Sequence, residues 1–221
     1  MAPKLHSIIA SPPVRAVLMC AKVLDVELEL IPVDLLSKDH LKDEYLKKNP
    51  QHTVPLLEED DGFLLADSHA IMGYLVNQYG KDDSLYPKND SRLRAVIDHI
   101  LHLDSSVLFI RGLFISKPLL FQKILPTEEK IKDLKEAFKI LDAVLEKNQT
   151  KYVAGNSLTI ADFSVVTTIT CFDSFTPYAE FPHLKAYIER MEQESWYELN
   201  KEGLAINKKM IGELMNELKN Q

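Results

Sequence analysis

The residues of this chain best placed to do chemistry are Val54-Pro55 and Asp67-Ser68. Proline removes a backbone donor and makes a cis peptide bond accessible. A cis bond before Pro55 would turn the N–H and C=O of Val54 away from the neighbouring strand, where an extended peptide can pair with them. Ser68 at a helix start would offer its N–H to a carboxylate, and Asp67 would bind an amino group. These residues predict a pocket for a peptide that carries both an acid and an amine.

The elements that must position these residues are short strands alternating with helices. An apolar run at residues 5–10 and an alternating run at 27–34 indicate strands, and two runs around the acidic turn at 58–62 indicate a β-hairpin. Helical spacing marks the segments 12–24 and 38–48 and the segment that begins at Ser68. The order is β-α-β-α-β-β-α with a proline opening the third strand, which is typical of an α/β thioredoxin-like domain.

A second chemical feature lies at the first strand–helix junction, where Ser11 precedes Pro12 and Pro13. The residue before a proline is held extended, and proline is tolerated in the first helical turn. Redox proteins of this fold carry Cys-x-x-Cys here, so the absence of cysteine excludes disulfide exchange by this site. The helix N-terminus can still stabilise a thiolate of a ligand, with the Ser11 hydroxyl donating to the sulfur. A helix cap is the structural alternative for Ser11, and both roles remain open.

Beyond a polar linker at residues 83–90, strand patterns end and residues 91–221 predict an all-α domain. A long helix is expected over 91–120, bent or broken at Pro118. Further amphipathic helices are expected over 127–147, 182–191 and 204–218. Thr159 and Asp162 form a capping box before a nearly apolar helix at 163–172. That position favours a folding role for Asp162 over a catalytic one.

Composition narrows the functional classes. A net charge of −7 without a basic stripe argues against nucleic acid as a partner. No apolar run reaches the roughly 20 residues that cross a bilayer, and the first residues lack the apolar core of a signal peptide. Cys20 and Cys171 lie far apart in apolar surroundings, which indicates buried, inert thiols. We therefore expect a cytoplasmic protein with no membrane partner and no metal.

Three motifs together resemble insect cytosolic glutathione S-transferases, and the epsilon class of the delta/epsilon group most closely. They are Ser-Pro-Pro-Val-Arg at 11–15, Asn-Pro-Gln-His-Thr-Val-Pro at 49–55 and Asp-Ser-His-Ala-Ile at 67–71. No single motif would suffice, but they occur in the right order and the resemblance covers nearly the whole chain. It implies a thioredoxin-like, glutathione-binding domain at 1–82, the linker at 83–90 and a helical domain at 91–221 that lines a hydrophobic acceptor site.

The resemblance assigns the parts of glutathione to this chain. Ser11 would be the catalytic donor to the thiol, and Asp67 with Ser68 would hold the γ-glutamyl end. Val54 would pair with the cysteinyl backbone, and two histidines would face the glycyl carboxylate. The implied glutathione-binding residues are His40, His52, Thr53, Val54, Pro55, Asp67, Ser68 and His69.

Several of these residues also have a purely structural interpretation. Asp67 is one methylene shorter than the Glu of many relatives, so a bridging water is an alternative to a direct amine contact. His40 lies on a polar helix, where solvation alone would explain it. His52 and Ser68 would also fit as braces of the hairpin.

The acceptor site is expected on one face of the long helix, because Phe109, Gly112, Ser116 and Leu120 recur at spacings of three and four. Gly112 and Ser116 are small, which predicts a roomy pocket, and Gly112→Phe should then weaken turnover of bulky electrophiles. Phe109 and Leu120 fit equally well as interdomain core, and Arg111 fits either a glutathione contact or a structural ion pair. The implied acceptor-site residues are Pro13, Leu35, Phe109, Gly112, Ser116, Leu120 and Met210, with Ile206 nearby.

The prediction is a homodimeric glutathione S-transferase with serine-type thiol activation, acting on hydrophobic electrophiles in detoxification or hormone-related metabolism. Glutathione is the co-substrate. Alternatives that use the same thiolate are elimination, peroxide reduction and steroid-linked chemistry. A non-catalytic carrier of hydrophobic ligands or a scaffold is the alternative of another class, and Ser11 within its full motif favours catalysis. The subunit contact is expected along residues 91–106, where charged and apolar residues mix.

Overall fold

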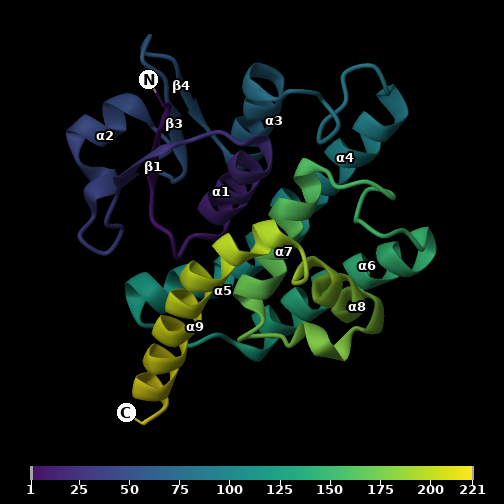
Figure 1. The fold of residues 1–221 in the computed structure, drawn as a ribbon. Coiled ribbons are helices and arrows are strands. Elements are labelled where there is room, and N and C mark those ends of the chain that lie inside the picture. Colours follow the sequence, from purple (N-terminus) through teal and green to yellow (C-terminus); the bar gives the residue numbers. More distant parts are fainter. Residues whose placement is uncertain (1, 221) are drawn as a thin grey trace.

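The computed structural model describes residues 2–220, with a sheet and three α-helices first and a helical region after them (Figure 1). This arrangement confirms the predicted fold class. The first region contains β1 (Lys4–Ser7), α1 (Pro12–Leu24), β2 (Glu29–Pro32), the 3-10 turn η1 (Asp39–Leu41), α2 (Asp43–Lys48), β3 (Leu56–Glu58), β4 (Leu64–Ala66) and α3 (Ser68–Tyr79).

The sheet has the strand order β2-β1-β3-β4, with β1 parallel to β2 and the other pairs antiparallel. Figure 1 shows it between α2 on one side and α1 with α3 on the other. Side chains alternate between these two faces. Leu5 and Leu57 pair across β1 and β3 and join the main core, whereas Leu56 packs with Tyr45 of α2 in a smaller cluster.

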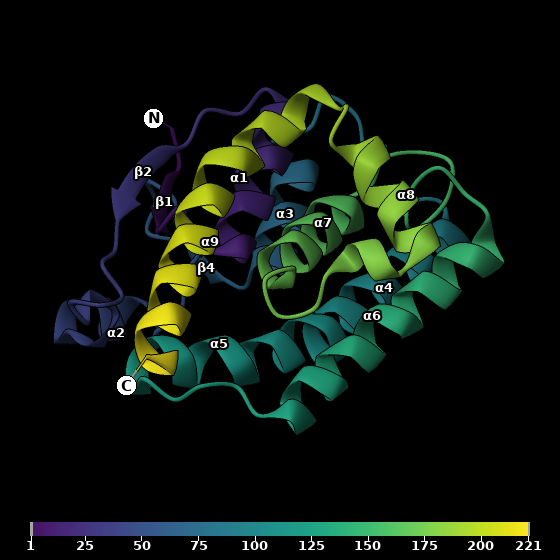
Figure 2. The same ribbon diagram turned by 90° about the horizontal axis from the view of Figure 1, so that it is seen from below.

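The second region is built around α7 (Ile160–Phe172), every residue of which is buried. Figure 2 shows it enclosed by α1 and α9 on one side and by α4, α6 and α8 on the other. Because α1 also packs on α7, the two regions share one continuous core. The helices are α4 (Ser91–Leu103), the π-helical segment η2 (Asp104–Phe109), α5 (Ile110–Gln122), α6 (Glu128–Asn148), α7, η3 (Tyr178–Glu180), α8 (Pro182–Met191), η4 (Ser195–Tyr197) and α9 (Glu198–Lys219).

The capping box that begins α7 is confirmed. Oδ2 of Asp162 accepts hydrogen bonds from the N–H and the hydroxyl of Thr159, at 2.9 and 3.0 Å. Oδ1 accepts from the N–H of Val153 at 2.9 Å and the hydroxyl of Tyr187 at 3.0 Å. Burial raises the pKa of Asp162 to about 6, although these bonds oppose the shift. Asp162 is therefore a folding element that ties three segments together.

Two helix predictions need correction. Of the two alternatives at Pro118, a bend or a break, the break does not occur, since α5 continues to Gln122 and ends where Lys123 takes a left-handed conformation. The interruption lies earlier, in the π-helical turn η2. The segment 38–48 is not one helix either, because Lys42 is extended and separates η1 from α2.

Both cysteines are buried and free, as expected. Among residues 2–220, no helix is long and apolar enough to span a bilayer.

Candidate functional site

A cavity of about 690 Å³ lies between the sheet region and the helical region. On the sheet side, its wall consists of the loop after β1, the η1 segment, residues 51–55 and the start of α3. On the helical side, the wall comes from η2, α5, α7 and α9. The first wall consists largely of loops and of the ends of strands and helices, where backbone groups are available. The second wall consists of side chains from helices.

Ser11 lies at the N-terminus of α1, and its hydroxyl makes no hydrogen bond within the described residues. It occupies the N-cap position with extended backbone angles, yet its side chain makes no capping hydrogen bond. Its N–H donates to the carbonyl of Ile8 at 2.9 Å, and its carbonyl accepts from Arg15 at 3.2 Å. The side-chain cap considered from the sequence is therefore absent. Ser11 lines the cavity, and its hydroxyl has no hydrogen-bond partner among residues 2–220.

The Val54–Pro55 peptide bond is cis, the form on which the hypothesis of a peptide pocket depends. The N–H and C=O of Val54 make no hydrogen bond within residues 2–220, although Pro55 beside it is buried. The preceding turn is braced by Asn49 and Tyr45, which donate to the carbonyl of Thr53 at 2.9 and 2.6 Å. The structure thus fixes the unpaired backbone N–H and C=O of Val54 at the cavity.

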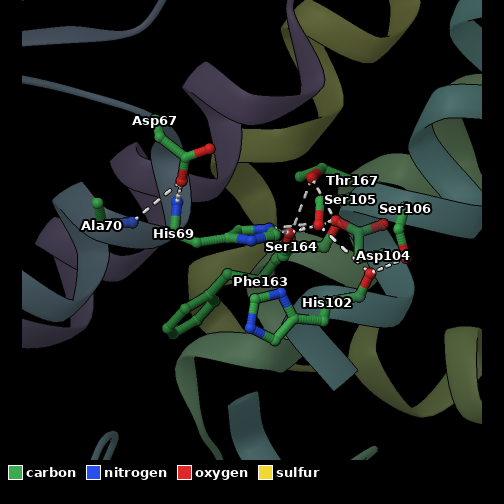
Figure 3. Close-up of polar contacts among 10 residues, drawn as sticks. All are labelled: Asp67, His69, Ala70, His102, Asp104, Ser105, Ser106, Phe163, Ser164 and Thr167. Carbon is green, nitrogen blue, oxygen red and sulfur yellow. Dashed lines mark hydrogen bonds and ion pairs between the residues drawn. The ribbon is translucent and has the colours of Figure 1, made fainter. Parts of the chain in front are cut away.

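Asp67 caps α3, and this cap uses one of its two carboxylate oxygens (Figure 3). Oδ1 accepts from the N–H of His69 at 2.9 Å and of Ala70 at 3.2 Å. Asp67 has a φ of 75°, a conformation that residues other than glycine seldom adopt. The cap leaves Oδ2 of Asp67 and the N–H of Ser68 available at a helix N-terminus, a place that favours an anion.

His69 joins the two walls through a buried network that the sequence did not reveal (Figure 3). Ser164 of α7 donates to Oδ2 of Asp104 at 2.5 Å, and Nε2 of His69 lies 2.6 Å from the Ser164 oxygen. Since the single hydroxyl proton of Ser164 goes to Asp104, Nε2 of His69 is the donor. Nε2 also lies 3.4 Å from Asp104 Oδ2.

The other carboxylate oxygen of Asp104, Oδ1, is buried without a hydrogen-bond partner among the described residues. Asp104 and Ser164 both line the cavity. Only His69 belongs to a motif, and no local pattern in the sequence marks the other two. The π-helical turn of η2 places the carboxylate inside, and π-helical turns are common at functional sites.

His40 and His52 lie together at the edge of the cavity, with ring centroids 6.1 Å apart. Nδ1 of His40 is buried and has no partner in the described chain. Burial lowers the pKa of His40, and the charges of His52 and Lys117 lower it further. An anion between these groups would restore the protonated form, so the pair fits a carboxylate.

Every predicted acceptor-site residue except Gly112 lines the cavity. Gly112 is buried, and a Cβ atom built there would lie 2.1 Å from the ring of Phe172. The prediction that Gly112 faces the acceptor is wrong, because the space beside it holds Phe172 and not a ligand. Phe172 itself lines the cavity and packs on Phe109 at a centroid distance of 6.0 Å. Sequence reasoning also missed Lys117, Phe121, Thr167, Thr168, Cys171 and Phe175, which line the helical wall.

Arg111 does not line the cavity. Its guanidinium donates to the carbonyl of Asp133 on α6 at 2.8 Å. Of the two interpretations from the sequence, the structural one is therefore closer, although the partner is a carbonyl and not a carboxylate.

Comparisons with known proteins agree with this geometry. Residues 5–83 match the glutathione S-transferase N-terminal domain, and residues 115–194 match its C-terminal domain. Glutathione S-transferase 1 of Manduca sexta is 43% identical over 87% of this chain and 89% of its own length.

Solved structures match over nearly the full length. An epsilon-class glutathione S-transferase from the housefly, Musca domestica, has a TM-score of 0.90 and 44% identity, covering 96% of this chain and 98% of that chain. A Drosophila mojavensis homolog with bound glutathione has a TM-score of 0.91 and 43% identity, covering 96% and 97%. This chain belongs to the glutathione S-transferase family, with insect epsilon- and delta-class members as its structural neighbours.

Proposed function

We propose that the chain conjugates glutathione to hydrophobic electrophiles and that Ser11 stabilises the glutathione thiolate. The observation that carries the proposal is the free Ser11 hydroxyl at the N-terminus of α1, in a cavity with a peptide-pairing edge on one side and apolar helices on the other. Membership of the glutathione S-transferase family supports the conjugation reaction. The position of Ser11 in this chain supports its role as the donor to the thiolate.

The energy required is modest. Lowering the thiol pKa by two units takes roughly 2.7 kcal/mol of differential stabilisation. A hydrogen bond to a charged group contributes about 1.5–3 kcal/mol, and a helix N-terminus about 0.3–1 kcal/mol. One serine and one helix therefore suffice, and no metal is needed. In the described part of the chain, no group of three or more acidic, histidine or cysteine side chains is arranged to hold one.

The peptide then binds along the sheet wall. The γ-glutamyl carboxylate takes the N–H of Ser68, and its amine meets Oδ2 of Asp67 directly or through a water. The cysteinyl backbone pairs with Val54, which places the thiol toward Ser11. The glycyl carboxylate enters between His40 and His52. Support comes from the available backbone groups at residues 54 and 68 and from the unpartnered Nδ1 of His40. The bound glutathione of the Drosophila mojavensis homolog supports the ligand's identity.

The assembly we propose is a cytoplasmic homodimer, with the boundaries at residues 82 and 91 separating its two domains. Along the expected contact on α4, Val96 is exposed and Arg94 stacks on the ring of Tyr86 at 3.6 Å. Light scattering at micromolar protein should give twice the chain mass. A monomer mass would remove this part of the proposal.

The central experiment follows the ionisation of bound glutathione by the ultraviolet absorbance of its thiolate. Ser11→Ala should raise the pKa of the bound thiol toward that of free glutathione, whereas Ser105→Ala, which removes another cavity hydroxyl, should not. Conjugation of a chloronitrobenzene-type electrophile is measured in parallel. Binding of electrophiles without any conjugation by the unaltered protein would instead support the carrier alternative.

A further inference from the structure

A buried arginine lies directly behind the loop that carries Ser11. Arg15 has no exposed surface, and its Nη1 donates to the carbonyls of Ala10 at 2.6 Å and Ile9 at 3.2 Å. Nε donates to Oδ1 of Asn200 on α9 at 2.7 Å. The guanidinium therefore holds the two residues that precede Ser11.

The charge of Arg15 is not neutralised. Within residues 2–220, no carboxylate approaches it within ion-pair distance, and its Nη2 is buried with no hydrogen-bond partner. The titratable groups that face it are Cys171 of α7 and Tyr197 of η4, and burial raises the pKa of both, so they are neutral near pH 7. Burial lowers the pKa of Arg15 itself, but arginine keeps its proton in proteins.

Packing alone does not account for a buried, unpaired cation at this position. Removing a charge from water is costly, and an apolar side chain of similar volume would often give a more stable fold. A cation close to the site of an anion lowers the free energy of that anion, and the effect is large where water is excluded. The anion that the proposed reaction forms beside Ser11 is the glutathione thiolate.

Helix α9 is pressed against the same loop. A Cβ atom at Gly203 would lie 2.1 Å from the carbonyl oxygen of Ile9 and 2.8 Å from Cδ of Arg15, so only glycine permits this approach. Asn200 is held in turn by its side-chain N–H bond to Thr170 of α7, at 3.2 Å. Arg15 thus touches the catalytic loop and the helix that closes the acceptor site.

We infer that Arg15 is a positioning residue for Ser11, fixing the loop 9–11 through its carbonyls and favouring the thiolate through its uncompensated charge. This inference rests on the proposed function of Ser11. The other charged or titratable side chains that line the cavity, apart from the buried Cys171, are His40, His52, His69, Asp67, Asp104 and Lys117. The two carboxylates among them oppose a thiolate, and the lysine among them lies on α5, whereas Arg15 contacts the loop that carries Ser11.

The test is Asn200→Asp, which keeps an acceptor for Nε of Arg15 and adds the missing negative charge. The pKa of bound glutathione thiol should rise by about one unit, with its affinity little changed. Thr170→Val is the matched control, because it removes the other bond of Asn200 and leaves the charge of Arg15 alone. This control should leave the thiol pKa unchanged.

The outcomes separate the inference from the proposed function. If Ser11→Ala raises the thiol pKa but folded Asn200→Asp does not, the role of Arg15 is overturned and that of Ser11 stands. If Ser11→Ala has no effect, the proposed function fails first. Should Asn200→Asp not fold, Arg15→Gln tests the same charge while keeping an amide donor for the loop carbonyls. Unfolding of both variants, or an equal shift in Thr170→Val, would make Arg15 merely structural.

Discussion

The two walls of the cavity are built on different principles. The sheet wall presents the hydroxyl of Ser11 and the free backbone groups of Val54 and Ser68 at the ends of elements, and short local motifs fix them. The helical wall presents side chains from η2, α5, α7 and α9, and only the packing of these helices decides which of them face the cavity. A fixed peptide suits the first construction, and variable apolar acceptors suit the second.

The largest effect should come from the sheet wall. Ser11→Ala should lower kcat by roughly 10- to 100-fold, the loss of one hydrogen bond worth about 1.5–3 kcal/mol in the activated state. The KM for glutathione should change little, because Val54 and Ser68 still hold the peptide. The pH–rate profile should move to higher pH, since the bound thiol ionises later. An unchanged kcat in a folded variant would show that a backbone group activates the thiol instead.

On the helical wall, Gly112→Ala should destabilise the fold by about 1–3 kcal/mol, the usual range for overpacking. The added Cβ would collide with Phe172, which is itself buried. Urea unfolding is the measurement. Gly212→Ala is the control, because nothing lies near the position of its added Cβ. Gly62 has open space around it too, but its positive φ would add backbone strain and makes it unsuitable. A stable Gly112→Ala with altered acceptor preference would restore the original prediction for this face.

The bond between the walls should have a smaller effect. His69→Ala removes the donor to Ser164 and should lower the free energy of unfolding by about 1 kcal/mol. His102→Ala is a suitable control, since its exposed ring makes no hydrogen bond within the described residues. Equal unfolding curves for His69→Ala and the unaltered protein would mean that water replaces the imidazole.

The smallest effect is expected at the edge of the sheet wall. His40→Gln should raise the KM for glutathione about threefold, as loss of a partly exposed anion contact would. Because the pKa of His40 lies below its ordinary value in the free protein and a carboxylate favours its protonated form, KM should fall as pH decreases. The variant should lose this trend. Glutathione with its glycyl carboxylate esterified should show no difference between the two proteins.

The features of the sheet wall could be predicted from the sequence more fully than those of the helical wall. The possible cis bond at Pro55, the helix starts after Ser11 and Asp67 and the capping box at Asp162 depend on a few consecutive residues, and the structure contains each of them. The predicted order of elements along the first region, β-α-β-α-β-β-α, is confirmed, and it also follows from local runs of apolar residues and prolines.

The helical wall was harder because its geometry is not local. Phe109, Ser116 and Leu120 line the cavity as their spacing predicts, but the space beside Gly112 is filled by the ring of Phe172 from α7, a contact that spacing along one helix does not show. The contact of Asp104 with Ser164 joins residues far apart in the chain, and no spacing rule reaches that far.

The two prolines after Ser11 have a further consequence. Pro12 and Pro13 have no N–H, so the first turn of α1 offers a capping hydroxyl few donors to accept from, and the Ser11 side chain stays uncommitted. The helix forgoes about 0.5–2 kcal/mol of cap stability. For the role that we propose, Ser11 is therefore preorganised, because its hydroxyl would have no existing hydrogen bond to break before it donates to a thiolate. In the proposed mechanism, the free energy of leaving the Ser11 hydroxyl without a capping bond is thus spent during folding and not during turnover.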